Sequence, residues 1–403
     1  MCPSAKKGAN QITTLVSPSA TQHRKNVSSK TGRLLSLDLF RGVTIAAMIL
    51  VNDPGDGPSA YWSLHHAVWN GWTPTDLIFP FFLFIVGVAM AFSFRSRLDR
   101  GAARARLLKH VLWRGLLLFA IGMFLNGFPN HYSLTTLRIY GVLPRIAICY
   151  VITAALELWT GWRAQIALAV ACLAGYWILM RYVPVPGFGI PTHDIPLLDP
   201  DRNIVAWLDR KLLMGHLYEG TRDPEGLLSN IPAVATCLLG LLTGKWMNTA
   251  HSPRLKASAM VAGGVFAVVV GRTMHRWFPI NKKLWTSSFV IFTAGLALIF
   301  LVAFYWASDV KQHRGWWTRP ILVFGTNAIA AYFFSEALSA ALSSITLTLT
   351  NGVVVSVQDY VYSRLFAPFA SPPNASLAYA LAYIALCWAT MAVLYRKGIV
   401  IKV

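Results

Sequence analysis

The sequence predicts an all-α polytopic membrane protein, a transmembrane bundle of about ten helices with outer-side loops capping the functional site. Three observations support this fold class. Apolar residues make up 55% of the 403 residues and charged residues only 13%, and the mean hydropathy is +0.51. The apolar residues form long continuous runs, which soluble globular domains do not carry in such number. A transmembrane β-barrel would alternate apolar and polar residues instead.

The chain divides at about residue 33. Residues 1–33 are polar and rich in Ser, Thr and Lys, without the apolar core of a signal peptide, so we expect a disordered cytoplasmic tail. Residues 34–403 form the predicted transmembrane domain. Its expected spans are residues 38–52, 75–94, 107–126, 139–159, 164–183, 228–247, 256–271, 285–306, 320–341 and 376–395. The span at 256–271 is short, and a glycine pair at 263–264 interrupts it.

Basic residues predict the orientation of these spans. With the N-terminus inside, the inner segments hold about 20 Lys and Arg and the outer segments about 10, as the positive-inside rule requires. The segment 95–106, RSRLDRGAARAR, is the strongest indication. Both termini are then cytoplasmic and the loop after the first span is outside. The same loops account for the net charge of +20, so we expect no nucleic-acid partner.

Two further segments predicted to lie outside are long enough to do more than connect helices. Residues 184–227 contain a possible short amphipathic helix, and residues 342–375 form an outer cap, a re-entrant segment or an eleventh span. We expect both to fold over the outer mouth beside the first loop. The five cysteines lack CxxC spacing and histidine neighbours, which favours small buried side chains over a metal site.

The first loop carries the main candidates for chemistry, within the stretch 34–94. His66 stands among Asn and Asp residues with no basic residue nearby, so it could act as a base or nucleophile, or only bind loop backbone. Its neighbour His65 points elsewhere. Asn52 ends the first span and could donate to an oxyanion or cap the helix. Asp76 follows a helix-start signature and could serve only the helix dipole.

Four polar residues within or beside the spans are candidates for binding an anionic cofactor. Arg114 and Arg145 lie inside spans, where a guanidinium is costly and suits phosphate. Arg41 is three residues from Asp38, so a structural ion pair is the simpler interpretation. Asn327 lies in the run FGTNAIAAYFFSEAL and could instead bond a neighbouring helix.

Longer motifs carry the assignment further. The first is RLLSLDLFRGVTIAAMILVN, followed by YWSLHHAVWNGWTPTDLIFPFFLFIVGVAM, YGVLPRIAICY, KKLWTSSFVIFTAGLAL and PILVFGTNAIAAY. Together these motifs resemble the signature of the heparan-α-glucosaminide N-acetyltransferase family, including its bacterial relatives. The chain also lacks the Walker A, GxSxG and HExxH motifs, which argues against an ATPase, a serine hydrolase and a zinc enzyme.

The resemblance implies an acetyltransferase domain over residues 34–403. Acetyl-CoA would supply acetyl from the cytoplasm, a glucosamine-type sugar outside would accept it, and no metal would take part. The family's active histidine in H-A-x-W-N-G corresponds to His66, and its asparagine at the end of the first signature helix corresponds to Asn52. We expect a bacterial-type core, without the additional N-terminal region of animal members, forming a homodimer in the bacterial inner membrane.

Two hypotheses for the mechanism remain open at this point. Arginines such as Arg114 or Arg145 would hold the CoA phosphates near the inner mouth, and His66 would either accept the acetyl group or deprotonate the amine. The alternative functions are a transporter or flippase for a sugar or lipid-linked sugar, and an O-acetyltransferase of an envelope polysaccharide. A transporter would leave its substrate chemically unchanged and would need no acetyl-CoA.

Overall fold

The computed structural model describes residue 1, residues 34–129 and residues 132–401. The expected tail therefore lies outside the described residues, apart from Met1. The helices are α1 Leu35–Asn52, α2 Ile78–Leu98, α3 Arg104–Gly127, α4 Val142–Trp159, α5 Trp162–Tyr182, α6 Ile204–Leu213, α7 Asn230–Met247, α8 Pro253–Met274, α9 Ser287–Phe304, α10 Thr318–Thr326, α11 Ala328–Ser344, α12 Val357–Leu365 and α13 Pro372–Arg396. Two short strands, β1 Thr346–Thr348 and β2 Val354–Ser356, pair in an antiparallel hairpin.

The predicted all-α polytopic fold is confirmed. Within the described ranges, eight helices are long and apolar enough to cross a membrane, or nine if α10 and α11 count as one broken span. Those eight coincide with eight of the ten predicted spans. The predicted span 320–341 is two helices that meet at Asn327 with a bend of 80°. The remaining prediction, 228–247, forms the 18-residue helix α7, which is not among the eight.

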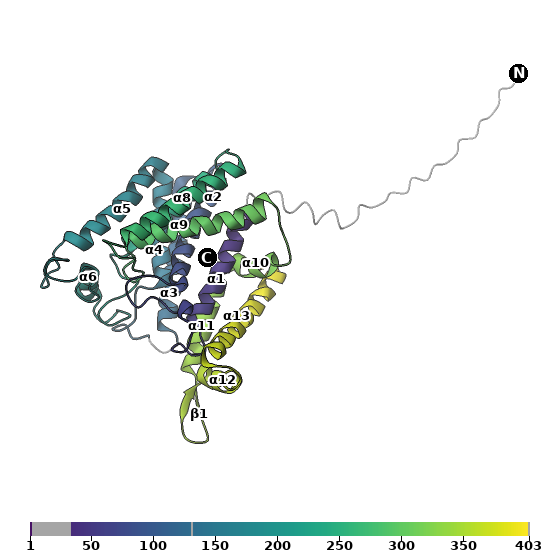
Figure 1. Ribbon diagram of the computed structural model, residues 1–403. Coiled ribbons are helices and arrows are strands. Elements are labelled where there is room, and N and C mark those ends of the chain that lie inside the picture. The colour runs from purple at the N-terminus through teal and green to yellow at the C-terminus, as the bar shows by residue number, and fades with distance from the viewer. Residues whose placement is uncertain (2–33, 130–131, 402–403) are drawn as a thin grey trace. The chain divides into compact units, whose positions relative to one another are not determined.

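Helix α7 lies in the middle of the bundle, against α2, α4 and α5. Its contact with α2 is close because two glycines face the partner's backbone. A Cβ at Gly87 would lie 2.0 Å from the Cys237 carbonyl oxygen, and a Cβ at Gly240 would lie 2.1 Å from that of Phe84. Helix α1 packs against α2, α10 and α13, with α10 and α13 to its right in Figure 1.

The glycine pair does not interrupt the seventh predicted span. Helix α8 runs without a break through Gly263 and Gly264 for 22 residues. Gly264 instead faces α9, where its Cβ would lie 2.9 Å from the carbonyl oxygen of Gly295. Gly264 therefore permits close packing of α8 on α9, and the expected interruption was wrong.

Both long segments contact the first loop, residues 53–73. From the first segment, Leu198 accepts a hydrogen bond from Trp69 Nε1 at 2.8 Å. The second segment forms the hairpin and the nine-residue α12, in the lower part of Figure 1, so the eleventh span is excluded there. Beside it, Asn374 accepts a hydrogen bond from Tyr61. We call the end of the bundle where these segments meet the site face.

Candidate functional site

Two of the predicted residues, His66 and Asp76, contact each other at the site face. The short helix Pro74–Leu77 carries Asp76, whose carboxylate is completely buried. Its Oδ2 accepts hydrogen bonds from the backbone N–H groups of Ala67 (3.0 Å) and Thr73 (2.9 Å). Its Oδ1 lies 2.7 Å from His66 Nδ1. A carboxylate that accepts from these N–H groups favours the tautomer in which His66 Nδ1–H donates and Nε2 keeps its lone pair.

The adjacent histidine does not take part in this pair. His65 Nε2 lies 2.9 Å from the carbonyl oxygen of Ala60, and the His65 carbonyl accepts a hydrogen bond from Thr73 Oγ1 at 2.6 Å. Both contacts are with other residues of the first loop, so His65 stabilises the conformation of that loop. The imidazole of His66 remains half exposed.

A third group at this site, Lys282, was missed by the sequence reasoning. Its Nζ lies 3.0 Å from Nε2 and 3.1 Å from Nδ1 of His66. Burial lowers the pKa of Lys282, and the charges of Glu225 and Asp76 oppose that shift. The signal was the pair KK directly before the apolar run LWTSSFV. A basic residue there is also typical of an ordinary loop, so the sequence alone gave no reason to single it out.

Asn52 lies at the same end of the bundle but contacts a different helix. Its Nδ2 donates to Glu336 Oε1 of α11 at 2.8 Å, and the end of α1 adjoins the short helix that carries Asp76. The next residue, Asp53, is only 4% exposed. Burial and the nearby charge of Glu336 raise the pKa of Asp53 to about 7. Asn52 thus borders an acidic region beside the His66–Asp76 pair.

Arg145 is completely buried near the start of α4. One guanidinium nitrogen, Nη2, donates to Ser229 Oγ, and the guanidinium lies 4.9 Å from the ring centre of Trp285. Its Nε and Nη1 have no hydrogen-bond partner among the described residues. Because Ser229 directly precedes α7 and Trp285 directly follows the loop of Lys282, Arg145 lies at the site face.

The remaining candidates lie elsewhere in the bundle. Arg114, midway along α3, is over the ring of Tyr150 of α4 at 5.3 Å. Arg41, near the start of α1, contacts Asp38 at 3.2 Å and the Gly325 carbonyl at 3.4 Å. Asn327 holds the chain's C-terminal segment, because it donates to the Ile399 carbonyl and accepts from the backbone N–H of Ile401.

These positions separate the candidates into groups. His66, Asp76, Asn52 and Arg145 lie at the site face. Arg41 lies at the opposite end of α1 from Asn52, about 16 Å along the helix axis for eleven residues. Phosphate binding by Arg41, Arg114 or Arg145 stays a prediction.

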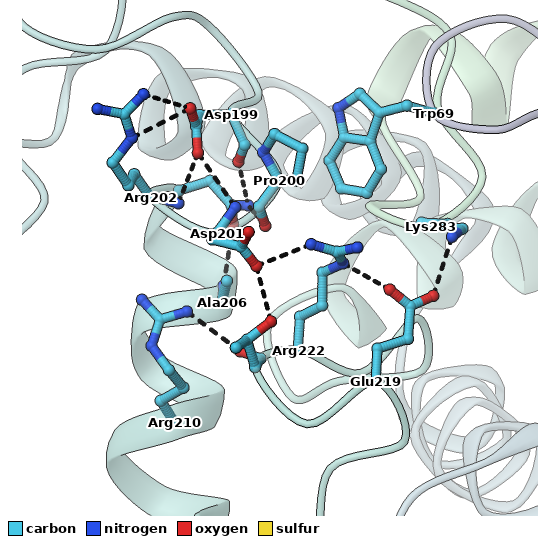
Figure 2. Close-up of polar contacts among 12 residues, drawn as sticks. Trp69, Asp199, Pro200, Asp201, Arg202, Ala206, Arg210, Glu219, Arg222 and Lys283 are labelled. Atoms are coloured by element: carbon cyan, nitrogen blue, oxygen red, sulfur yellow. Dashed lines mark hydrogen bonds and ion pairs between the residues drawn. The ribbon is translucent and has the colours of Figure 1, made fainter.

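A second polar network supports the site face from the segment between α5 and α7. Figure 2 shows Arg222 between Asp201 (2.7 Å) and Glu219 (2.6 Å), with Lys283 also on Glu219 at 2.9 Å. The guanidinium of Arg222 lies 5.2 Å from the ring centre of Trp69. This network fixes the segment to the first loop three residues from His66.

Arg138 ties the start of α4 to the same segment. It pairs with Asp223 and with Glu225, each at 2.6 Å. Burial opposes its charge, but the two carboxylates outweigh burial and raise the pKa of Arg138. An ion pair that is buried and satisfied on both sides positions its elements rather than binding a substrate.

Comparison with known proteins adds independent information. Residues 33–276 match the family model described as heparan-alpha-glucosaminide N-acetyltransferase, catalytic. Proteins named heparan-alpha-glucosaminide N-acetyltransferase from Mus musculus and Homo sapiens are each 31% identical to this chain, over 373 and 367 residues. The alignments cover 77% and 75% of this chain, and 54% and 53% of the relatives. The chain therefore spans about half the length of the curated relatives it matches.

Proposed function

The chain belongs to the heparan-α-glucosaminide N-acetyltransferase family, and from this we propose that it transfers acetyl from acetyl-CoA to the amine of a glucosamine-type sugar. The observation that carries the proposal is the contact of His66 with the buried carboxylate of Asp76. An orienting carboxylate on Nδ1 leaves Nε2 as the reactive atom of the ring.

His66 acts by one of two routes in this proposal. Nε2 removes a proton from the acceptor nitrogen while that nitrogen attacks the thioester carbon, or Nε2 attacks that carbon first and passes the acetyl group on. In both routes the carbon–sulfur bond breaks and CoA leaves as a thiolate. Asn52, close to the same loop, would donate from its amide to the acyl oxygen after releasing Glu336.

The donor substrate, acetyl-CoA, is proposed to enter from the cytoplasmic end of the bundle. Arg41 lies at the end of α1 remote from His66 and suits a CoA phosphate there, while Arg114 lies partway along the bundle. The uncompensated guanidinium atoms of Arg145 favour negative charge at the site face, where the thioester oxygen and the thiolate would develop it.

The acceptor is proposed to arrive at the site face, outside the cell membrane. An amino sugar is a cation before it reacts, and the acidic region of Asp53 and Glu336 would attract it. The distribution of basic residues supports this orientation, with both termini in the cytoplasm and the first loop outside. We propose a bacterial inner membrane as the location and a homodimer as the assembly.

The test uses purified protein in liposomes with acetyl-labelled CoA and glucosamine, comparing wild type with His66→Ala. We expect label on the sugar amine with the wild type only, because the substitution removes the ring nitrogen that the buried carboxylate of Asp76 orients. The His66→Ala protein should still insert and bind acetyl-CoA, which equilibrium binding of the labelled donor checks.

Each other outcome has a distinct meaning. Binding of acetyl-CoA without transfer by the wild type would show that the acceptor is not glucosamine. Neither binding nor transfer would contradict the acetyltransferase proposal and favour a transporter. Equal transfer by His66→Ala would refute the assigned role of the histidine. An acetyl-histidine trapped in the absence of acceptor would select the two-step route.

A further inference from the structure

Lys282 lies against the reactive nitrogen of His66. Its Nζ is 3.0 Å from Nε2 and 3.1 Å from Nδ1. Because the two ring nitrogens are nearly equidistant from it, the amine lies over the face of the imidazole and not on the in-plane lone pair of Nε2. That lone pair stays open to a substrate, and the amine lies close to any group that reacts there. Asp76 contacts the ring at Nδ1.

The backbone around Lys282 is fixed on both sides. Asn281 Oδ1 accepts from the N–H of Leu284 at 2.9 Å, and Asn281 Nδ2 donates to Asn70 Oδ1 of the first loop at 3.2 Å. The Lys282 carbonyl accepts from the N–H of Trp285 at 3.0 Å. Because this turn is bonded to the loop that carries His66, the two side chains keep a defined separation.

The neighbouring lysine points elsewhere. Lys283 pairs with Glu219 at 2.9 Å, within the network beside Trp69 (Figure 2). The two lysines are adjacent and chemically identical, yet only Lys282 reaches the imidazole. Lys283 is therefore a matched control for any experiment on Lys282.

Acetyl transfer from a thioester to an amine needs two proton movements. The acceptor nitrogen must lose a proton, and the departing thiolate must gain one. His66 Nε2 can accept the first. It could return that proton to sulfur only in a later step, whereas a second acid beside it protonates the sulfur while Nε2 still holds the acceptor's proton. Resting on the function proposed above, we propose that Lys282 is the general acid that protonates the sulfur of the departing CoA.

The protons and bonds balance over one turnover that begins when the sugar ammonium loses one proton to solvent and becomes a neutral amine. The amine nitrogen forms its bond to the carbonyl carbon and loses a second proton to His66 Nε2. The carbon–sulfur bond breaks, its electron pair stays on sulfur, and the Lys282 ammonium gives that sulfur a proton. The half-exposed imidazole then releases its proton to solvent, and the Lys282 amine regains one from solvent. The products are an amide and a thiol, and both residues return to their starting states.

The surroundings of Lys282 suit an acid that must release its proton. Burial lowers the pKa of Lys282, which makes the ammonium a stronger acid than an exposed lysine. The negative charges of Glu225 and Asp76 keep part of the ammonium form, and the positive charges of Arg145 and Lys283 oppose it. Lysines tuned by burial in this way serve as acids and bases elsewhere in enzymes.

The test measures kcat and KM for acetyl-CoA across pH in wild type, Lys282→Met, Lys282→Arg and Lys283→Met. Lys282→Met should lose about 10²–10⁴-fold in kcat with KM for acetyl-CoA nearly unchanged. Wild-type activity should fall at alkaline pH as the ammonium deprotonates, below the ordinary lysine pKa of about 10.4. Residual activity of Lys282→Met should lack this alkaline fall. Lys283→Met should keep the wild-type kcat, and its alkaline fall should move to slightly higher pH, because one positive charge that opposes the Lys282 ammonium is lost.

The outcomes distinguish this inference from the function on which it rests. If the wild type transfers no acetyl, the proposed function fails before Lys282 is considered. If Lys282→Met keeps wild-type kcat, or loses activity yet keeps the same alkaline fall, Lys282 is not the acid. Lys282→Arg answers the question if Lys282→Met does not fold, because a guanidinium keeps the positive charge but does not release a proton in proteins. Lys282→Arg should therefore lose kcat as Lys282→Met does, and wild-type kcat in Lys282→Arg would overturn the proposal.

Discussion

Asp76 both builds the first loop and orients the histidine. Its Oδ2 accepts two backbone N–H groups, and its Oδ1 accepts the N–H of His66. An amide at this position could accept only through its single oxygen, so one of these two functions must be lost. The carboxylate that a sequence pattern assigns to a helix dipole is thus also part of the site.

We expect Asp76→Asn to reduce kcat by about 10²–10⁴-fold. The asparagine NH₂ would face His66 and favour the tautomer that protonates Nε2, which removes the reactive lone pair. The measurement is the rate of acetyl transfer at saturating acetyl-CoA, with donor binding followed separately.

Asp359→Asn is the matched control for this prediction. Asp359 is also a first-turn carboxylate, bonded to Ser356 at the start of α12, and its carboxylate bonds no histidine among the residues that the structure describes. Transfer by this variant should stay at the wild-type rate. Equal losses in the two variants would mean that Asp76 acts only through the fold of a helix start.

Local sequence predicted the candidates of the first loop, but not their partners. The position of Asp76 after Thr73 and Pro74 could be read directly, because capping acts over three residues. Lys282 reaches His66 across 216 positions of the chain. Periodicity and composition carry no information on that pairing. Arg145 shows the same limit, since its placement at the site face depends on how α4 packs.

At the scale of the helices, the contact between α2 and α7 determines the middle of the bundle. Gly87 and Gly240 let the two backbones approach so closely that a Cβ at either position would overlap a carbonyl oxygen of the other helix. Such small residues allow helices to pack closely in a membrane, where apolar side chains gain little from leaving lipid. Because α2 begins directly after the helix that carries Asp76, this contact also supports the site.

We expect Gly87→Ala to destabilise the protein by about 1–3 kcal/mol. The new Cβ would lie 2.0 Å from the Cys237 carbonyl oxygen and 2.7 Å from the Leu241 nitrogen, and neither backbone atom can move alone. The measurement is the thermal unfolding midpoint in detergent, which should fall.

Gly263→Ala is the control, because nothing lies within 4 Å of the Cβ that it would add to α8. Its midpoint should stay the same or rise slightly, since alanine favours the helix over glycine by about 0.5–1 kcal/mol. A Gly87→Ala protein as stable as the wild type would show that α2 and α7 are farther apart.

The sequence predicted where the long helices lie, but it did not predict where a helix breaks. Long apolar runs gave eight spans within a few residues of their observed ends. The break at Asn327 lies inside a run whose composition continues across it, and the Asn327 side chain there bonds the backbone of Ile399 and Ile401. The glycine pair of α8 gave the opposite error: two adjacent glycines predicted an interruption, but the helix is continuous there. Tertiary contacts decide both cases.

For the whole molecule, the two ends of the bundle differ in what they carry. The site face gathers His66, Asp76 and Lys282 under the two long segments. The opposite end includes the turn after α2, in the basic stretch 95–106. Transfer across a membrane requires that these ends face different compartments.

We expect a cysteine at Asn351, in the turn of the hairpin, to react with a membrane-impermeant maleimide in intact spheroplasts. A cysteine at Asp99, just after α2, should react only after the membrane is opened, because the basic stretch around it is retained in the cytoplasm. Both positions are exposed. Cys2 and the partly buried Cys172 would be replaced by serine in both variants and in the parent that serves as the control. The cysteines at 149, 237 and 387 are buried and should stay unlabelled.

Labelling of Asp99→Cys from outside, with protection of Asn351→Cys, would show that the bundle has the opposite orientation in the membrane. Donor and acceptor would then meet on the cytoplasmic side, and the proposed transfer across the membrane would be wrong even if acetyl transfer itself were observed.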